Sequence, residues 1–189
     1  MSQIVPFDPS ARSRTPLPRQ QAGFAELITT SNFSFLRSGS HPEELVSAAM
    51  QMGMTAMGLC DRNSFAGVVR AYVVVRDRDK KLFPDFRYFV GVRLCFADGT
   101  PDIIAYPTTR VAYGRLCKLL TLGNQRGEKG NPKLFFSDLF GSGGPAATNE
   151  QGPSENYAQG QLFILVPDEA NWPLTAQTLD ALSRLSRCG

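Results

Sequence analysis

Four side chains with the chemistry of metal ligands stand beside predicted strands or helix starts: Glu26, His41, Asp61 and Asp102. In hydrolytic centres, carboxylates and imidazoles hold Zn²⁺ or Mn²⁺, and the ion activates water for attack on a phosphoester. Asp61 directly follows an apolar strand, and strand ends are favoured site positions in α/β barrels. A multinuclear centre needs several imidazoles, yet His41 is the single histidine of 189 residues. These residues therefore predict, at most, a non-standard metal site.

Each candidate also has an ordinary structural interpretation. His41 follows a predicted helix cap, and Asp61 can pair with its neighbour Arg62 or cap the next helix near Ser64. The four cysteines are scattered without a Cys-x-x-Cys pair, so neither a zinc ribbon nor a disulfide framework is indicated. Cys60 ends an apolar strand without a nearby histidine, which favours a buried thiol over a nucleophile.

The first predicted elements are a strand and a helix. Residues 24–28 form a short strand, and Ser40 with Glu43 opens the helix as a capping box, in which hydroxyl and carboxylate each accept from a free backbone N–H. Gly53 supplies a left-handed stop. The apolar face of the helix recurs at spacings of three and four: Leu45, Ala48, Ala49 and Met52.

Strands and helices are expected to alternate along the rest of the chain. The elements are a strand at 56–60, a helix over 68–75 capped by Ser64, a strand at 89–96, a hairpin through Asp98-Gly99 into a strand at 102–106, a helix from Thr109 to Gly123, a strand at 162–166 and a helix at 175–187. Such alternation favours an α/β fold with a largely parallel sheet or barrel.

The composition is that of one folded domain, with 42% hydrophobic and 20% charged residues. Residues 1–23 are rich in Pro and Arg, so we expect a flexible leader before a domain at 24–189, and residues 141–160 are expected as an exposed Gly/Pro/Ser-rich insertion. The leader lacks the apolar segment of a secretory signal, and no apolar run reaches the roughly 20 residues of a membrane span. The cytoplasm is therefore the expected location.

Three blocks of sequence resemble one family. Residues 26–37 (ELITTSNFSFLR) and 40–46 (SHPEELV) are similar to the opening of PHP domains, the polymerase and histidinol phosphatase type. Residues 60–71 (CDRNSFAGVVRA) and the segments DIIAYP and AYGRLCKLLTLG resemble the branch found in error-prone DNA polymerases of the polymerase III alpha-subunit class. The resemblance covers about residues 24–140. It implies an α/β fold of the PHP type, a distorted (β/α) barrel that is partial in this chain.

The resemblance also implies where active members carry metal ligands, and this chain departs from that pattern. Ile28 and Thr30 stand where phosphatase members have a His-x-His pair, and neither replaces an imidazole. Arg62 stands at a histidine position, and Arg93 at the position of a common glutamate. Because a guanidinium repels a divalent cation, we predict a degenerate site and no metal cofactor.

The two arginines suggest what replaces the metals. Arg62 and Arg93 could neutralise Asp61 and Glu26, giving a salt-bridged core at the former site. The alternative is a residual metal-dependent phosphoesterase with Zn or Mn, which would use the four candidate ligands Glu26, His41, Asp61 and Asp102. Metal retained by the purified protein would favour this alternative.

The function implied by the resemblance belongs to a larger enzyme. The chain is expected to be the N-terminal PHP domain, or a fragment, of an error-prone DNA polymerase acting in damage-induced mutagenesis and translesion synthesis. The polymerising aspartates of the family lie in a palm domain beyond this chain, so the chain alone is expected to be non-catalytic. Its expected partners are the palm and thumb modules and other damage-tolerance proteins. A free-standing binding module from a split polymerase gene is a further alternative.

Two loops carry weaker signals. The basic segment 125–133 can contact DNA phosphate, but a solvated loop explains it as well, and no aromatic platform is expected to accompany it. The glycine-rich stretch at 141–144 lacks the Gly-Lys-Ser/Thr ending of a phosphate loop and is predicted to be linker. Contact between this chain and DNA therefore stays an open question at this point.

Overall fold

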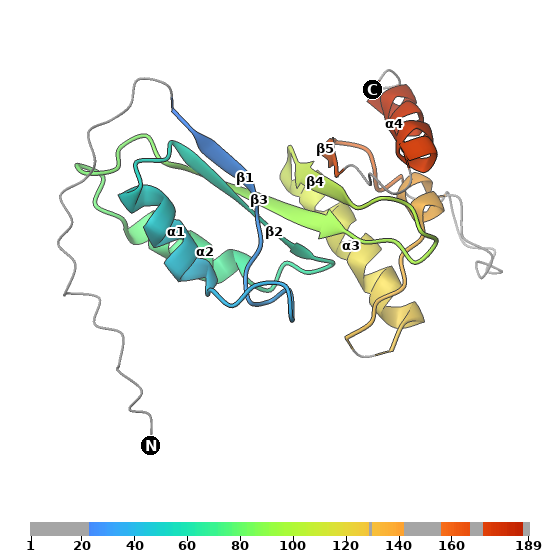
Figure 1. The fold of residues 1–189 in the computed structure, drawn as a ribbon, viewed down its shortest axis with the longest axis horizontal. Coiled ribbons are helices and arrows are strands. Elements are labelled where there is room, and N and C mark those ends of the chain that lie inside the picture. Colours follow the sequence, from blue (N-terminus) through green and yellow to red (C-terminus); the bar gives the residue numbers. More distant parts are fainter. Residues whose placement is uncertain (1–22, 129, 142–155, 167–171, 187–189) are drawn as a thin grey trace.

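Five strands form one mixed sheet in the computed structural model of the chain, which describes residues 23–128, 130–141, 156–166 and 172–186 (Figure 1). The elements are β1 (Ala25–Thr29), α1 (Pro42–Gln51), β2 (Ala56–Arg62), α2 (Val68–Asp77), β3 (Arg87–Leu94), β4 (Ile103–Pro107), α3 (Arg110–Arg126), the 3-10 helix η1 (Phe136–Phe140), β5 (Gln161–Leu165) and α4 (Trp172–Ser186). Each predicted strand and helix is present, with shifted ends.

The strands lie in the sheet in the order of the sequence, β1-β2-β3-β4-β5. β1, β2 and β3 are parallel, whereas β4 pairs antiparallel with both β3 and β5. The predicted hairpin from β3 to β4 is confirmed, since a connection this short does not allow the crossover that parallel strands need. The expectation of a largely parallel sheet is therefore wrong for its second half.

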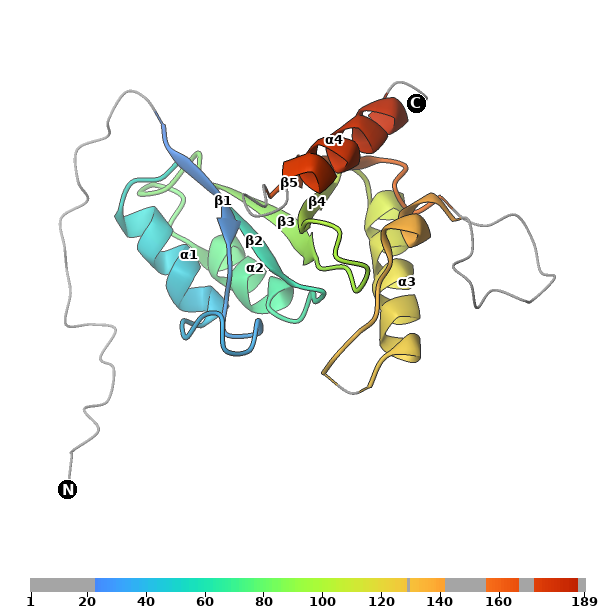
Figure 2. The ribbon, with the colours of Figure 1, turned by 45° about the vertical axis from the view of Figure 1, so that its right-hand side comes forward.

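The helices α1, α2 and α3 cover one face of the curled sheet (Figures 1 and 2). Alternate strand residues point to that face, among them Leu59 of β2, Val92 of β3 and Ile103 of β4, each at most 1% exposed. Burial of each such side chain stabilises the fold by about 2 kcal/mol. The opposite face of these strands carries Arg62, Arg93 and other polar groups.

The first helix begins one residue later than predicted. His41, not Ser40, is the N-cap, and its N–H donates to Glu44 Oε2 at 2.9 Å, with Pro42 in the first turn. The predicted apolar face is also partly wrong. The buried residues are Pro42, Val46, Ala49 and Met50, whereas Ala48 and Met52 are exposed. Gly53 has the predicted left-handed backbone, with φ of +74°.

Of the predicted caps of the next two helices, the first is wrong and the second is confirmed. Ser64 does not cap α2, whose N-cap is Gly67; the Ser64 hydroxyl instead accepts from Ala66 N at 3.1 Å. Thr109 caps α3 as predicted and accepts from Ala112 N at 3.1 Å. Gly123 does not end α3. It lies within the helix, where a Cβ would come 2.6 Å from Leu134 Cδ2, so the glycine allows close packing.

The leader at 1–22 and most of the proposed insertion, 142–155, lie outside the described residues. The end of the insertion is described, and it is not a loop free of the core. Ala158 is 6% exposed, and its N–H donates to Leu139 O at 3.0 Å. No helix in the described parts of the chain has both the length and the apolar character needed to cross a bilayer.

Candidate functional site at the carboxyl ends of the parallel strands

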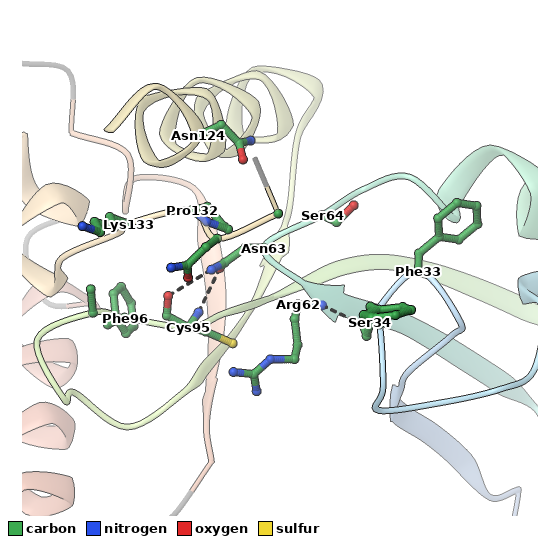
Figure 3. Close-up of a pocket in the computed structure, with 14 residues that line it drawn as sticks. Phe33, Ser34, Arg62, Asn63, Ser64, Cys95, Phe96, Asn124, Pro132 and Lys133 are labelled. Carbon is green, nitrogen blue, oxygen red and sulfur yellow. Dashed lines mark hydrogen bonds between the residues drawn. The ribbon is translucent and has the colours of Figure 1, made fainter. Parts of the chain in front are cut away.

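A pocket of about 650 Å³ lies at the carboxyl ends of β2 and β3 (Figure 3). Because β1, β2 and β3 are parallel, their carboxyl ends meet at one edge of the sheet, where ligand sites of α/β folds gather. The loop after β1 and the loop after α3 complete the walls. The lining includes Phe33, Phe35, Arg62, Asn63, Phe96 and Lys133.

Asp61 anchors the loop after β1 and is 2% exposed. Its Oδ1 accepts from Ser31 N at 2.8 Å and from Ser34 Oγ at 2.7 Å, and its Oδ2 accepts from Ser31 Oγ at 2.7 Å. The Ser34 hydroxyl accepts in turn from Arg62 N at 2.9 Å. Three charge-assisted hydrogen bonds offset the cost of burying the carboxylate. The oxygens of Asp61 are therefore engaged in holding the loop.

Asp102 lies between two arginines on the opposite face of the sheet. Its Oδ2 accepts from Arg93 Nε at 2.7 Å and from Arg62 Nη1 at 3.1 Å. The side chains of Arg62, Arg93 and Asp102 are 33%, 26% and 21% exposed, so solvent screens the ion pairs only in part. One carboxylate faces two guanidiniums, so this group of three side chains carries one net positive charge.

The hypothesis that Arg62 and Arg93 neutralise Asp61 and Glu26 is wrong, because the two arginines pair with a different acid. Successive residues of a strand point to opposite faces, so Asp61 turns toward the helices and Arg62 away from them. Glu26 Oε1 accepts from Ile28 N at 2.8 Å, within its own strand. The acid that the two arginines share is Asp102.

The structure does not bring the four candidate ligands together. Asp61 and Asp102 lie on opposite faces of the sheet, and His41 lies at the N-cap of α1, with its Nδ1 2.9 Å from Asn32 Nδ2. Within the ranges that the structure describes, no group of three or more His, Cys, Asp or Glu side chains could hold a metal ion. The residues present do not fit a multinuclear metal centre.

The four positions assigned to lost ligands are distributed over the same strand ends. Ile28 belongs to β1 and Thr30 follows it, and neither lines the pocket. Arg62 lines the pocket, and its partner across the β2–β3 ladder is Arg93. The two arginine positions are thus neighbours in space.

Asn63 fixes the pocket wall, and its role was not predicted. Its Oδ1 accepts from Cys95 N at 2.9 Å, and its Nδ2 donates to Cys95 O at 3.0 Å, so the side chain pairs with the backbone as another strand would. The residue has φ of +45°. Asparagine tolerates this left-handed region better than most residues, and that tolerance is the signal that could have marked it.

A second unpredicted network lies on the face of the sheet away from the helices. Tyr106 of β4 donates its hydroxyl proton to Leu27 O of β1, and Cys60 Sγ lies 3.0 Å from the same hydroxyl. Gly58 and Gly91 make room for the ring, because a Cβ at either position would collide with it. Burial raises the pKa of Cys60 to about 12, against the effect of the Tyr106 hydrogen bond. The thiol is therefore protonated at neutral pH.

Comparison with known families identifies the class of this fold. The PHP domain model matches residues 26–150, which is more than half of the chain. The chain therefore belongs to the PHP domain family. Its curled sheet is a PHP-type α/β barrel that is incomplete in the described residues.

Curated relatives are polymerases. The chain is 55% identical over 116 residues to an error-prone DNA polymerase of Rhodopseudomonas palustris (strain BisA53), covering 61% of this chain and 10% of the relative. It is 43% identical over 167 residues to an error-prone DNA polymerase of Bradyrhizobium diazoefficiens, covering 86% of this chain and 13% of the relative. Among solved structures, it is similar to an amidohydrolase from Chromobacterium violaceum with a TM-score of 0.42, at 17% identity and covering 54% of this chain and 34% of the other.

Proposed function

We propose that this chain is the PHP portion of an error-prone DNA polymerase, and that it serves that enzyme as a structural module without hydrolytic chemistry of its own. The observation that carries the proposal is the ion-pair group at the strand ends. Asp102 is shared by Arg62 and Arg93, where metal ligands would be needed.

The charges argue physically against a metal ion at this position. A guanidinium about 4 Å from a divalent cation opposes it by roughly 8 kcal/mol at an effective dielectric constant of about 20. Asp102 offsets one of the two guanidiniums, and Asp61 is committed to Ser31 and Ser34. Binding an ion here would require breaking contacts that stabilise the fold.

In the whole enzyme, the domain would brace the palm and thumb modules during synthesis across damaged DNA, alongside other damage-tolerance proteins. The support is the name of the relatives and the share of their length that the chain covers, 10% to 13% in the two described above. Nucleotidyl transfer and its role in damage-induced mutagenesis would belong to the rest of the polymerase.

The test is the metal content of the purified chain by mass spectrometry, together with hydrolysis of bis(p-nitrophenyl) phosphate with Mn²⁺ or Zn²⁺ added. We expect substoichiometric metal and no turnover above the buffer rate. Near-stoichiometric metal with turnover that is lost in Asp61→Ala or Asp102→Ala, but kept in Asp77→Ala at the surface, would overturn the proposal. Circular dichroism of each variant separates loss of a ligand from loss of the fold.

A further inference from the structure

We propose that the pocket at the carboxyl ends of β2 and β3 binds one unstacked nucleotide, with its base against phenylalanine rings and its phosphate beside the positive wall. This goes beyond the function proposed above, because it is a binding activity and requires neither a metal ion nor hydrolysis. The volume, about 650 Å³, lies in the range of small-molecule sites.

The large apolar side chains of the wall are aromatic, beside the smaller Ala97 and Pro132. Phe33, Phe35 and Phe96 line the pocket, whereas no Leu, Ile, Val or Met is found among the described residues of the lining. Phe33 and Phe96 lie on opposite sides of it (Figure 3). Aliphatic walls would suit the apolar side chains of a peptide. Flat rings suit the face of a planar heterocycle, which stacks on them whatever the base.

The aromatic loop is held in place while its side chains stay in water. Phe35 is 83% exposed and Leu36 is 86% exposed, although Asp61 fixes the loop through Ser31 and Ser34. Exposed apolar groups on a fixed loop are typical of binding surfaces. Since the loop is already ordered, binding of a ligand to the Phe35 ring costs little conformational entropy in the loop.

The charge of the lining favours an anion. Arg62 and Lys133 line the pocket, and neither Asp nor Glu does so in the part of the chain that the structure describes. Arg62 shares the carboxylate of Asp102 with Arg93, so these three side chains together carry one net positive charge. A phosphate attached to the stacked base would experience that charge.

Amide groups complete the chemistry that a base edge requires. Asn124 and Asn131 line the pocket from the end of α3 and the loop after it, and both are exposed. Asn63 is engaged with Cys95 and shapes the wall only. In the sequence, the basic segment 125–133 is followed by Phe135 and Phe136, and in the fold its residues 130–133 line the same pocket as Phe33, Phe35 and Phe96. The basic segment and the phenylalanines therefore share one pocket.

The proposal is tested by fluorescence anisotropy of a labelled oligo(dT) with the full chain, in a buffer containing EDTA. An abasic oligomer of equal length has the phosphates without the bases, and we expect it to bind at least tenfold more weakly. Unlabelled dTMP is the competitor. If dTMP displaces the labelled oligomer, the pocket takes a free nucleotide. If oligo(dT) binds and dTMP does not displace it, the pocket takes a nucleotide within a single strand. Both results support a base pocket.

Variants locate the binding. Phe35→Ala should weaken oligo(dT) binding about tenfold, because one base loses its stacking partner. Phe24→Ala removes a ring that is 61% exposed just before β1 and does not line the pocket, so it should leave binding unchanged. Lys133→Gln should weaken binding and lower its salt dependence, whereas Lys81→Gln should do neither.

Three results would overturn the proposal. The first is equal affinity for oligo(dT) and the abasic oligomer, which would mean contact through phosphate alone. The second is an equal effect of Phe35→Ala and Phe24→Ala. The third is no binding of any oligomer or of dTMP, which would leave a protein partner for the aromatic loop. Because EDTA is present throughout, none of these depends on whether the chain retains a metal.

Discussion

The hydroxyl of Tyr106 in β4 donates a hydrogen bond to the carbonyl oxygen of Leu27 in β1, across the two strands that separate them. The sulfur of Cys60 lies 3.0 Å from that hydroxyl and 3.4 Å from the same carbonyl oxygen. The ring rests over Gly58 and Gly91. This contact links the first and fourth strands and supports the curl that gathers the strand ends around the pocket.

Tyr106→Phe is expected to keep the ring and remove the link. The free energy of unfolding should fall by about 1 kcal/mol, since the carbonyl of Leu27 loses a hydrogen-bond donor. Urea denaturation followed by circular dichroism measures the change. Tyr72→Phe, at a residue that is 52% exposed on α2, is the matched control and should leave the midpoint in place. Equal shifts in the two variants would show that the link contributes nothing.

Asp61→Asn is expected to loosen the loop after β1. The new amide nitrogen cannot accept from the Ser31 hydroxyl, so a buried donor loses its partner and stability should fall by about 2 to 3 kcal/mol. Amide hydrogen exchange at residues 31–37 should become faster than in the parent chain. Exchange that stays slow in this loop would contradict the anchoring role. Asp77→Asn, at an exposed acid, should change neither quantity.

Asp102→Asn leaves two guanidiniums without their shared acid. We expect a loss of about 1 to 2 kcal/mol, reduced from that of a fully buried pair because all three side chains are partly exposed. Added salt should recover part of it, since screening weakens the repulsion of Arg62 and Arg93. Arg62→Met keeps the 2.7 Å contact between Arg93 and Asp102 and should cost less. The opposite ranking in urea denaturation would refute the sharing of one acid.

Stability is expected to fall at alkaline pH. Burial raises the pKa of Cys60 and of Cys95 to about 12 from the ordinary value of 9.0, and burial also raises the pKa of Tyr106. In the unfolded chain the thiols ionise near pH 9, whereas in the folded chain they remain protonated. Their contribution is therefore complete below about pH 9 and is lost as the pH rises toward about 12. In urea titrations at stepped pH, Cys60→Ala should show a shallower decline, and an unchanged slope would exclude this thiol as a source.

The outer strands of the described sheet, β1 and β5, each have one neighbour and therefore one open edge. Open edges offer unpaired N–H and C=O groups to other chains, so we expect the chain alone to self-associate as its concentration rises. Light scattering after size exclusion measures the mass. A monodisperse monomer that melts cooperatively would contradict this expectation.

Local signals in the sequence predicted much of the fold. The Thr109 cap, the left-handed Gly53 and the hairpin into β4 depend on hydrogen bonds and backbone geometry within a few residues, which the sequence displays directly. The same reasoning gave a wrong prediction at Gly123, because this glycine makes room for Leu134 and does not end the helix. The sequence alone does not distinguish a glycine that ends a helix from one that allows close packing.

The site depended on contacts that are distant in sequence. The predicted second strand ended at Cys60, but β2 continues to Arg62. The prediction therefore did not include the alternation of strand side chains that places Asp61 and Arg62 on opposite faces of the sheet. With the correct end of the strand, this alternation would have excluded an ion pair between Asp61 and Arg62. Phe33 and Phe96 line one pocket because the parallel pairing of β1, β2 and β3 brings the strand ends together, and no local pattern encodes this.

The strand order also bears on how the chain reaches this structure. Each strand pairs with the one that precedes it in the sequence, so no strand waits for a distant segment before it can be added. During synthesis, β2 can dock on β1, β3 on β2, and β4 can fold back on β3 while later residues are still inside the ribosome. Tyr106 emerges near the end of this series, and its contact with Leu27, 79 positions earlier, closes a structure assembled in the direction of translation.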